Sequence, residues 1–542
     1  MDAKTLHEEG LALFSKRSTL MLLWQEEAEN FYPERADFTY QRTVGNDWAG
    51  NLATSYPVLC RRDLADQVGT MLRPTQKEWF HMSPTDPSRE DNDAKRWLQW
   101  AANVMRRAMY DKRSLYSRAV KTGDNDFASF GQAVLTVRMN RDGDRLLYRC
   151  YHLRDCAWME DENGEICAVF RKWKPKARDL KRLFGAKVHK RVDDLLTQNK
   201  PFQEIECMHM LVAADMFDGD ARGKPWFSIQ YDVENTHSME EVAQWNKEYI
   251  IPRWFTIDGS PYAYSPATVI ALPEARLLQA MTYTLLEAGE KVTNPPVIAT
   301  IDAVRSDMAI YAGGQIWVDR DYDERMGDAL RPMNIDAKGM PLGIEMQQDS
   351  RALIKECFYL NKLSLPQRAP EMTAYEVGQR IQEYIRGALP LFEPMEMDYN
   401  GTTCEATFDL MLRNGAFGSP HDMPKSLQGA EIVFRFESPL HDAIGAQKGQ
   451  KLLEMQQMVA SAATMDKNAA AVPDAVEALR DALDGVGTPA KWVRSEVTAK
   501  QMIESQQKAE QAQAMLATMQ QGGDIAQKLA AARKDTAAAV PA

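Results

Sequence analysis

The sequence lacks the motifs that mark a nucleotide-driven motor or a common hydrolase. It has no GxxxxGK(S/T) phosphate-binding loop, because Gly223-Lys224 is followed by proline and has no glycine at the required upstream spacing. It also has no HExxH, GxSxG or dinucleotide-binding motif. The sequence therefore predicts no catalytic residue, no cofactor and no metal site, and we expect a protein that is not an enzyme.

Cysteine is scarce, and its spacing argues against a disulfide framework. The seven cysteines are an odd number and are scattered along the chain. Cys150, His152, Cys156 and Cys167 lie close enough in sequence to be weighed as a zinc site. They lack the CxxC pairs of familiar zinc sites and fall in a region that we interpret as successive strands, so buried thiols are favoured over zinc.

The chain also lacks a long apolar run and an excess of positive charge. It has no run of 18 apolar residues, and its amino terminus, MDAKTLHEEG, differs from a secretory signal, so we expect no membrane partner and a protein made and used in a cytoplasm. The formal net charge is −12, from 65 basic and 77 acidic residues. Tight, static binding to nucleic acid is therefore not expected, whereas loose guidance of DNA remains open.

A chain of 542 residues exceeds one hydrophobic core and is expected to form several domains of mixed α and β structure. Apolar residues recur at helical spacing in 18–31, 55–72 and 93–110. Trp97 and Trp100 of the third helix could stack on bases, but at this spacing we assign them to the core. The periodicity then changes to that of a β-meander, with further strands after it. Strands are expected at 133–138, 146–153, 166–171, 204–214, 227–233 and 250–257.

A basic segment, 174–200, interrupts these strands with short helical patterns. Its functional interpretation is contact with DNA or with an acidic partner. Its structural interpretation is a solvated helix face, which we favour because charge runs on short helices are usually solvated.

Two long helical patterns, 271–292 and 344–363, flank a compact excursion. Asn294-Pro295-Pro296 ends the first helix, and a hairpin is expected around Gly313-Gly314 within the excursion. At 1.5 Å per residue each helix is about 30 Å long. The sequence therefore predicts a stalk of two helices with a knob at its end.

The stretch after the stalk begins with two prolines in 363–371 and then resumes helical patterns. Thr373 and Glu376 form a capping box that is expected to open a helix over 374–389. Thr402 and Glu405 form a second box, which is expected to open a helix that ends at Asn414-Gly415. A strand at 431–437 and helices at 443–461 and 474–483 follow, and the tail at 495–534 is rich in Gln and Ala.

Several phrases in and after the stalk carry a resemblance to a known family. They are YAYSP at 262–266, ALPEAR at 271–276, Asn294-Pro295-Pro296, FYLNKL and MTAYEV within 358–377, FRFESPL at 434–440 and VPDAVEALRDALDGVGTPAKWVRS at 472–495. As a set they resemble the head-to-tail connector (portal) proteins of short-tailed bacteriophages. The resemblance covers most of residues 20–505.

The resemblance implies an α+β, multidomain portal fold. It divides the chain into an amino-terminal wing, a first stem helix, a clip, a second stem helix, a tunnel loop, the rest of the wing and a helical crown. The amino-terminal wing is 1–265, the first stem helix 266–293, the clip 294–341 and the second stem helix 342–363. The tunnel loop is 364–373, the rest of the wing 374–490 and the crown 491–542.

The function implied by the resemblance is that of a dodecameric ring at one capsid vertex of the virion, assembled in the host cytoplasm. The ring would be the channel for DNA packaging and ejection. Its implied partners are further copies of the chain, weakly bound double-stranded DNA, the terminase large subunit, the major capsid and scaffolding proteins, the tail adaptor and internal core proteins.

The resemblance also indicates which residues to examine. Lys362, Gln367 and Arg368 are candidates for contact with DNA in the channel, at and in the tunnel loop. Stem candidates are Glu274, Gln279, Glu287 and Lys355. Two other classes of function remain: a nucleic-acid-processing enzyme whose metal is held by dispersed carboxylates, and a structural adaptor that stacks on a portal. The clip between two long helices favours the portal.

Overall fold

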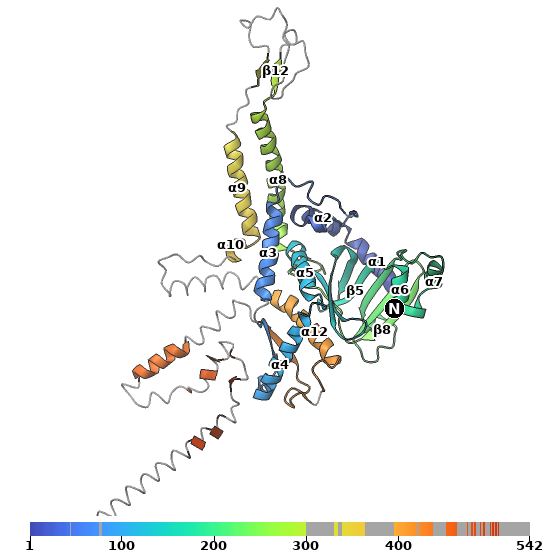
Figure 1. The fold of residues 1–542 in the computed structure, drawn as a ribbon, viewed down its shortest axis with the longest axis vertical. Helices are drawn as coiled ribbons and strands as arrows, with labels where there is room; N and C mark the ends of the chain where they lie inside the picture. Colours follow the sequence, from blue (N-terminus) through green and yellow to red (C-terminus); the bar gives the residue numbers. More distant parts are fainter. Residues whose placement is uncertain are drawn as a thin grey trace, which may run out of the picture. The chain divides into compact units, whose positions relative to one another are not determined.

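The computed structural model describes residues 1–43, 45–74, 78–299, 330–333, 339–363, 395–419, 422–436 and 451–462, with isolated residues and short runs between 474 and 508. The described chain is a mixture of helices and sheets, as expected (Figure 1). It divides into two units. The first comprises Met1–Trp79 and Met105–Ala416, and the second comprises Phe80–Val104 and Phe417–Ala542.

The first unit begins with three helices, α1 (Ala3–Lys16), α2 (Ser18–Phe31) and α3 (Tyr56–Leu72), and continues with α5 (Tyr116–Phe130). Helices α2 and α3 agree with the sequence prediction. Helix α1 and helix α5 were not predicted. The side chain of Asp2 caps α1 by accepting a hydrogen bond from the Thr5 amide at 2.8 Å.

Two antiparallel sheets follow, rather than one meander. The three-stranded sheet has the order β3-β2-β9, and the five-stranded sheet runs from β4 to β8 in chain order. Two short helices, α6 (Ala177–Phe184) and α7 (Lys190–Thr197), are inserted between β5 and β6. The strands are β2 (Val134–Met139), β3 (Leu146–Tyr151), β4 (Cys156–Glu160), β5 (Ile166–Trp173), β6 (Cys207–Ala213), β7 (Trp226–Asp232), β8 (His237–Gln244) and β9 (Tyr249–Ile250).

Two predictions within this unit were wrong in detail. Residues 250–257 form no continuous strand, since β9 is followed by a separate two-residue strand, β10 (Phe255–Thr256), which pairs with β11 (Ala263–Tyr264). The helix expected from Thr402 to Asn414 is present as α12 (Thr402–Arg413), but no capping box opens it, because a π-helix (Glu396–Gly401) runs directly into it and Thr402 has helical dihedral angles.

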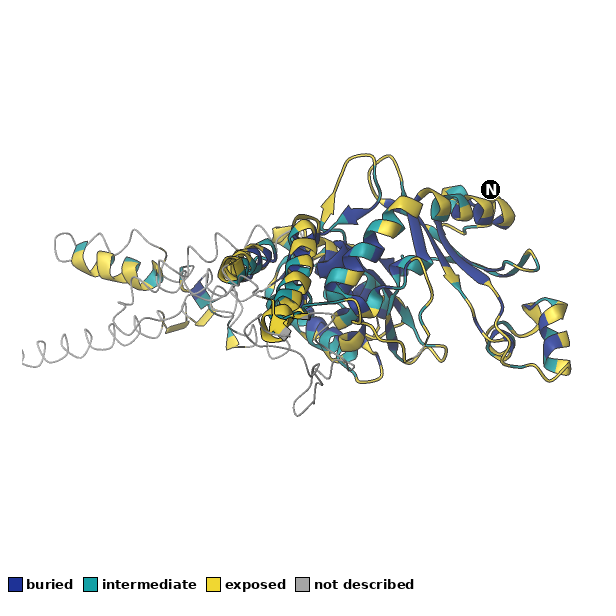
Figure 2. Cartoon of the chain, turned by 90° about the horizontal axis from the view of Figure 1, so that it is seen from above, coloured by how far each residue is buried: buried dark blue, intermediate teal, exposed yellow. Residues whose placement is uncertain are grey.

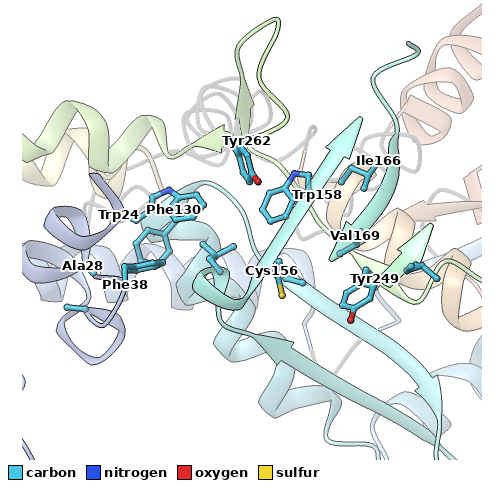
Figure 3. Close-up of a cluster of buried hydrophobic side chains, with 14 residues drawn as sticks. Trp24, Ala28, Phe38, Phe130, Cys156, Trp158, Ile166, Val169, Tyr249 and Tyr262 are labelled. Carbon is cyan, nitrogen blue, oxygen red and sulfur yellow. The ribbon is translucent and has the colours of Figure 1, made fainter. Parts of the chain in front are cut away.

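Aromatic side chains from distant segments form the core beside the five-stranded sheet (Figure 3). The Trp24 ring lies 5.6 Å from that of Phe38, and the Trp158 ring lies 4.6 Å from that of Tyr262. Burial of these rings joins α2, the sheet and the segment that leads into the stalk. Figure 2 shows the buried residues concentrated in this sheet and in the helices next to it.

In the second unit, β1 (Phe80–Pro84) pairs antiparallel with β14 (Ile432–Phe436), which lies where a strand was expected. The rings of Trp97 and Trp100 in α4 (Asn92–Met109) pack against Phe417 at 6.1 and 6.3 Å. Trp100 remains 47% exposed, so its assignment to the core was wrong. The predicted hairpin around Gly313-Gly314, the helix over 374–389 and most of the tail lie outside the described residues.

Candidate functional site: the two-helix stalk

The first stalk helix, α8 (Pro266–Thr293), is anchored by its amino-terminal turn. It is attached to the part of the first unit that lies outside the stalk, which we call the body. The Ser265 side chain donates a hydrogen bond to the Ala128 carbonyl at 2.8 Å, and the Thr268 hydroxyl donates one to the Ser129 carbonyl at 2.7 Å. Both acceptors belong to the last turn of α5. These side chains therefore satisfy carbonyls that a helix end leaves without partners, and they connect the two helices.

A glycine at the end of α5 allows this close approach. Gly131 has a φ of +70°, and a Cβ at this position would lie 2.1 Å from the carbonyl carbon of Tyr264. Any other residue would have to move the strand that leads into α8. The start of the stalk is thus fixed by backbone contact as well as by hydrogen bonds.

The second stalk helix, α9 (Gly339–Cys357), lies beside α8 (Figure 1). The Gln347 amide donates a hydrogen bond to the Thr282 hydroxyl at 2.8 Å. One turn higher, a Cβ on Gly343 would lie 2.7 Å from the Leu285 side chain. A small residue at 343 therefore lets the two helices approach each other closely.

At its lower end α9 packs into the body. Ile354 and Phe358 are fully buried, and the Phe358 ring lies 5.4 Å from that of Phe31 in α2. Burial raises the pKa of the Cys357 thiol, and the nearby charges of Glu274 and Glu356 raise it further. The short helix α10 (Leu360–Leu363) follows.

Beyond the far ends of the two helices, β12 (Val297–Ala299) pairs antiparallel with β13 (Leu330–Pro332). This pairing holds together the two chain segments that leave α8 and enter α9. The stalk is therefore closed at its tip by a short sheet, within the range that the sequence assigned to a clip.

The structure places the four stem candidates in different surroundings. Glu287 is exposed and forms an ion pair with Lys291 at 2.6 Å, and Lys355 is exposed as well. Glu274 is half-buried near Cys357. Gln279 is half-buried and bonds within its own subunit, because its side-chain oxygen accepts from the backbone amides of Ala53 and Thr54 at 2.8 and 3.0 Å.

The tunnel-loop candidates lie at or beyond the edge of the described chain. Lys362 is in α10, but only its backbone is described. Gln367 and Arg368 fall in 364–394, outside the described residues. Their assignment to the channel remains a prediction.

The sequence analysis missed a second apolar face on the stalk. On α8, Val269, Ile270 and Leu277 are 43%, 60% and 44% exposed, and they lie opposite the buried Ala271, Ala275 and Leu278. Helix α9 adds Leu342, Ile344, Met346 and Leu353, which are 48–61% exposed. The spacing of 270 and 277 by two helical turns was the available signal.

The residues weighed as a zinc site do not meet. His152 Nε2 lies 2.8 Å from Asp37 Oδ1, Cys156 is buried in the aromatic core, and the Cys167 thiol is directed to the Met159 carbonyl. In the described ranges, no group of three or more His, Cys, Asp or Glu side chains could hold a metal ion. Nor do these ranges contain a helix that is both long and apolar enough to cross a membrane.

The basic segment forms α6 and α7, and acidic neighbours neutralise much of its charge. Lys174 pairs with Glu206 at 2.5 Å, and Lys181 pairs with Asp193 at 2.7 Å. Lys187 pairs with Glu240 at 3.2 Å on strand β8. Such exposed pairs agree with the interpretation of a solvated helix face.

Comparison with known proteins connects this architecture to one family. The model of the family "Bacteriophage head to tail connecting protein" matches residues 3–494. The chain belongs to this family. The resemblance seen in the sequence is confirmed, and so is the function expected from it, that of a phage head-to-tail connector or portal protein.

Two relatives support the same conclusion. A protein described as "Probable portal protein" from Bordetella phage BPP-1 is 24% identical over 80% of this chain and 78% of its own length. The "Portal protein" of Salmonella phage epsilon15 is 20% identical over 74% of this chain and 72% of its own length. In a solved structure, "Virion of native gene transfer agent (GTA) particle", one chain aligns at a TM-score of 0.33 with 9% identity, covering 74% of this chain and 89% of that one. A TM-score at this level supports no conclusion.

Proposed function

We propose that copies of this chain assemble side by side into a closed, dodecameric ring at one vertex of the phage capsid, and that double-stranded DNA passes through the centre of the ring. The observation that carries this proposal is the exposed apolar surface of α8 and α9. A head-to-tail connector has to present a continuous passage, and a ring of stalks supplies one.

The exposed stalk residues explain why the subunit would assemble. Fully burying one Leu, Ile or Met side chain contributes about 1.5–3 kcal/mol. Ile270 and Leu342 are 60% and 61% exposed, so a lone copy leaves most of this free energy unused. Because α8 and α9 present different apolar rows, one copy can pack its α8 against a neighbour, and repetition around an axis closes a ring.

The charge of the chain suits a passage through which DNA slides. Twelve copies carry a formal charge of 12 × −12, or −144. Affinity for DNA grows with each phosphate that a protein neutralises, so an acidic ring holds DNA weakly. Weak, non-specific contact is what a channel for packaging and ejection needs.

We assign the remaining parts of the portal by the same proposal. Helices α8 and α9 are the stem, and residues 294–341 are the clip. Residues 1–265 and 374–490 form the wing, and residues 491–542 form the crown. In the virion the ring would dock the terminase large subunit, contact the major capsid, scaffolding and internal core proteins and later hold the tail adaptor. The chain itself would have no catalytic activity and would assemble in the host cytoplasm.

Negative-stain microscopy and native mass spectrometry of the purified full-length chain test the ring. We expect closed rings with a central channel and a mass that is a multiple of 61.4 kDa. Rings of other sizes from overexpression would still support ring closure, although not the count of twelve. Only monomers or dimers near physiological salt would contradict the proposal.

A second test concerns the tunnel loop, which we place at residues 364–373. Changing Lys362 and Arg368 together to Ala should leave the ring intact and alter DNA packaging or retention in assembled particles, because these cations would touch passing phosphates weakly and repeatedly. Arg113→Ala, on the exposed surface of the body, is the matched control for loss of positive charge. If the double variant packages DNA as the wild type does, the loop is only a connection between helices.

A further inference from the structure

The described residues between η1 (Pro33–Arg35) and α3 include an exposed segment without helix or strand, residues 39–43 and 45–52, which we call the arm. Segments of this length without secondary structure are uncommon in compact domains, where they are usually functional sites or linkers. Nothing in the connector function described so far uses the arm. Its side chains and attachment points indicate what it binds.

One cation and two aromatic rings form a cluster on the arm. The Arg42 guanidinium lies over the Tyr40 ring at 5.4 Å and over the Trp48 ring at 5.0 Å. It also donates hydrogen bonds to the Tyr40 hydroxyl at 2.8 Å and to the Pro33 carbonyl at 3.0 Å. Tyr40 and Trp48 nevertheless remain 45% and 40% exposed. Trp, Tyr and Arg are the residues that dominate binding free energy at protein interfaces.

The arm is fixed to the stalk at its carboxyl end. The Gln279 side chain accepts from the Ala53 and Thr54 amides at 2.8 and 3.0 Å and donates to the Thr54 carbonyl at 3.0 Å. One turn along α8, the Tyr283 hydroxyl donates to the Asn51 carbonyl at 3.1 Å. These four hydrogen bonds hold the end of the arm on one flank of α8, so the cluster is presented from a defined place.

Helix α9 occupies another flank of α8. Thr282 and Leu285 of α8 contact α9, and at about 100° per residue their mean direction lies about 110° around the helix from that of Gln279 and Tyr283. Among the described residues, no hydrogen bond, ion pair or ring contact joins the arm to α9 of the same copy. The subunit therefore carries its arm and its α9 on different flanks of α8.

The outer surface of α9 is complementary to the arm in chemistry. Leu342, Met346 and Leu353 form an apolar row, 61%, 48% and 48% exposed. Glu345, Asp349 and Glu356 are exposed beside that row, on the side away from α8. An aromatic pair fits the apolar row, and a guanidinium fits the carboxylates. The arm has one carboxylate in its described residues, Asp47, which accepts a hydrogen bond from the Ala49 amide at 3.0 Å.

We propose that the arm of one copy docks on the outer face of α9 in the next copy of the ring. Tyr40 and Trp48 pack on the Leu342–Met346–Leu353 row, and Arg42 pairs with the acidic row. The inference rests on the proposed ring and names the contact that closes it. Each copy would then present one surface to the next copy and a different surface to the previous one. This arrangement is called heterologous, and rings are built from it.

Cysteine crosslinking in the full-length protein tests the contact directly. Trp48→Cys and Met346→Cys are introduced together, and the assembled protein is oxidised. We expect a ladder of covalent oligomers on a denaturing gel, which disappears on reduction. When the two single variants are co-assembled, the crosslinks should be limited to dimers. Trp48→Cys combined with Leu183→Cys is the matched control, because Leu183 is similarly exposed, at 46%, but lies on α6.

A charge reversal provides an independent measurement. Arg42→Glu should lower the fraction of rings by about tenfold at a subunit concentration where half of the wild type is assembled. Arg42→Glu combined with Asp349→Arg should restore most of that fraction. Recovery shows that the double variant folds and that the loss in Arg42→Glu comes from the contact with Asp349, whereas a structural role for Arg42 alone gives no recovery.

The outcomes separate this inference from the proposed function. If the wild type forms rings but neither ladder nor charge rescue is seen, the arm docks elsewhere, on DNA or on a capsid protein, and the inference is wrong while the ring stands. If the wild type forms no ring at all, both are wrong.

Discussion

In the body of the first unit, ionised groups are buried and paired, whereas on the stalk apolar side chains are left in water. Arg73 and Asp124 form an ion pair with side chains that are only 4% and 7% exposed. The Arg73 guanidinium also donates to the Asn400 amide oxygen at 2.6 Å. Helix α8 presents the opposite picture, with Ile270 60% exposed and its ion pair Glu287–Lys291 fully on the surface.

The difference shows which part of the subunit is complete by itself. Arg73 and Asp124 neutralise each other within one subunit, so this buried charge needs no partner chain. The stalk is anchored to the body at Ser265 and Phe358 but leaves its outer faces uncovered. Changes in the body are therefore expected to act on stability, and changes on the stalk are expected to act on assembly.

The largest effect is expected from breaking the buried pair in the body. Asp124→Ala leaves the Arg73 guanidinium buried without a counter-charge, and removing one partner of such a pair destabilises a protein by about 3–5 kcal/mol. The measurement is the denaturant midpoint of the soluble protein. Asp409→Ala, which breaks the exposed pair with Arg413 at 2.8 Å, is the control and should change the free energy of unfolding by less than about 1 kcal/mol. Equal losses in the free energy of unfolding of the two variants would contradict the contrast between buried and exposed ion pairs.

A pH dependence of the body is the next largest expected effect. Glu27 in α2 is 2% exposed, and burial, aided by the charge of Glu26, raises its pKa to about 8 from the ordinary 4.5. The folded protein thus keeps this proton up to about pH 8, whereas the unfolded chain loses it near pH 4.5. The contribution of this group to the free energy of unfolding is therefore full below pH 4.5 and is lost as the pH rises to 8.

Glu27→Gln should remove this dependence, because the amide stays neutral at every pH. We expect the variant to exceed the wild type by about 2–4 kcal/mol in free energy of unfolding at pH 8.5 and to match it near pH 4.5. Urea unfolding at a series of pH values measures the difference. Glu9→Gln is the control, since Glu9 is exposed on α1 and lies on another helix. A wild type whose stability does not fall over this interval would disprove the assignment.

The sequence predicted the first stalk helix well because its signals are local, whereas the second, expected over 344–363, ends at Cys357 and is followed by the separate helix α10. Ser265 and Pro266 mark the start of α8, and Asn294-Pro295-Pro296 marks its end, so the helix could be placed from neighbouring residues alone. The family phrases of the sequence lie in and after this region, and they led to the connector function. The two-stranded tip was not predicted, because β13 (Leu330–Pro332) falls in a stretch where the sequence indicated no strand.

The body was harder to predict because its elements depend on distant partners. Helix α5 contains Gly123, Asp124, Asn125 and Asp126, which are weak helix formers, and no pattern indicated a helix there. Three of these side chains bind Arg73, Arg61 and Arg35 from other segments. The arm was missed for the same reason, since its attachment to Gln279 spans more than two hundred residues.

The smallest effect on stability is expected on the stalk, where two neighbouring leucines give a matched pair. Leu277 is 44% exposed and Leu278 is fully buried. Leu277→Ala should change the free energy of unfolding by about 0.5 kcal/mol or less, whereas Leu278→Ala leaves a cavity and should lower it by about 2–5 kcal/mol. Thermal unfolding of the unassembled fraction measures both, so that contacts between copies do not enter.

Assembly should rank the two variants in the opposite order once folding is taken into account. Folded Leu277→Ala subunits lose part of the apolar face that we place between copies, so their ring fraction should fall at a given concentration, and adding Ile270→Ala should lower it further. Folded Leu278→Ala subunits keep that face and should assemble as the wild type does. If Leu277→Ala instead lowers the free energy of unfolding as much as Leu278→Ala does, the outer face of α8 is packed within the subunit. The contrast between the body and the stalk would then be wrong for α8, the helix that provides most of its evidence.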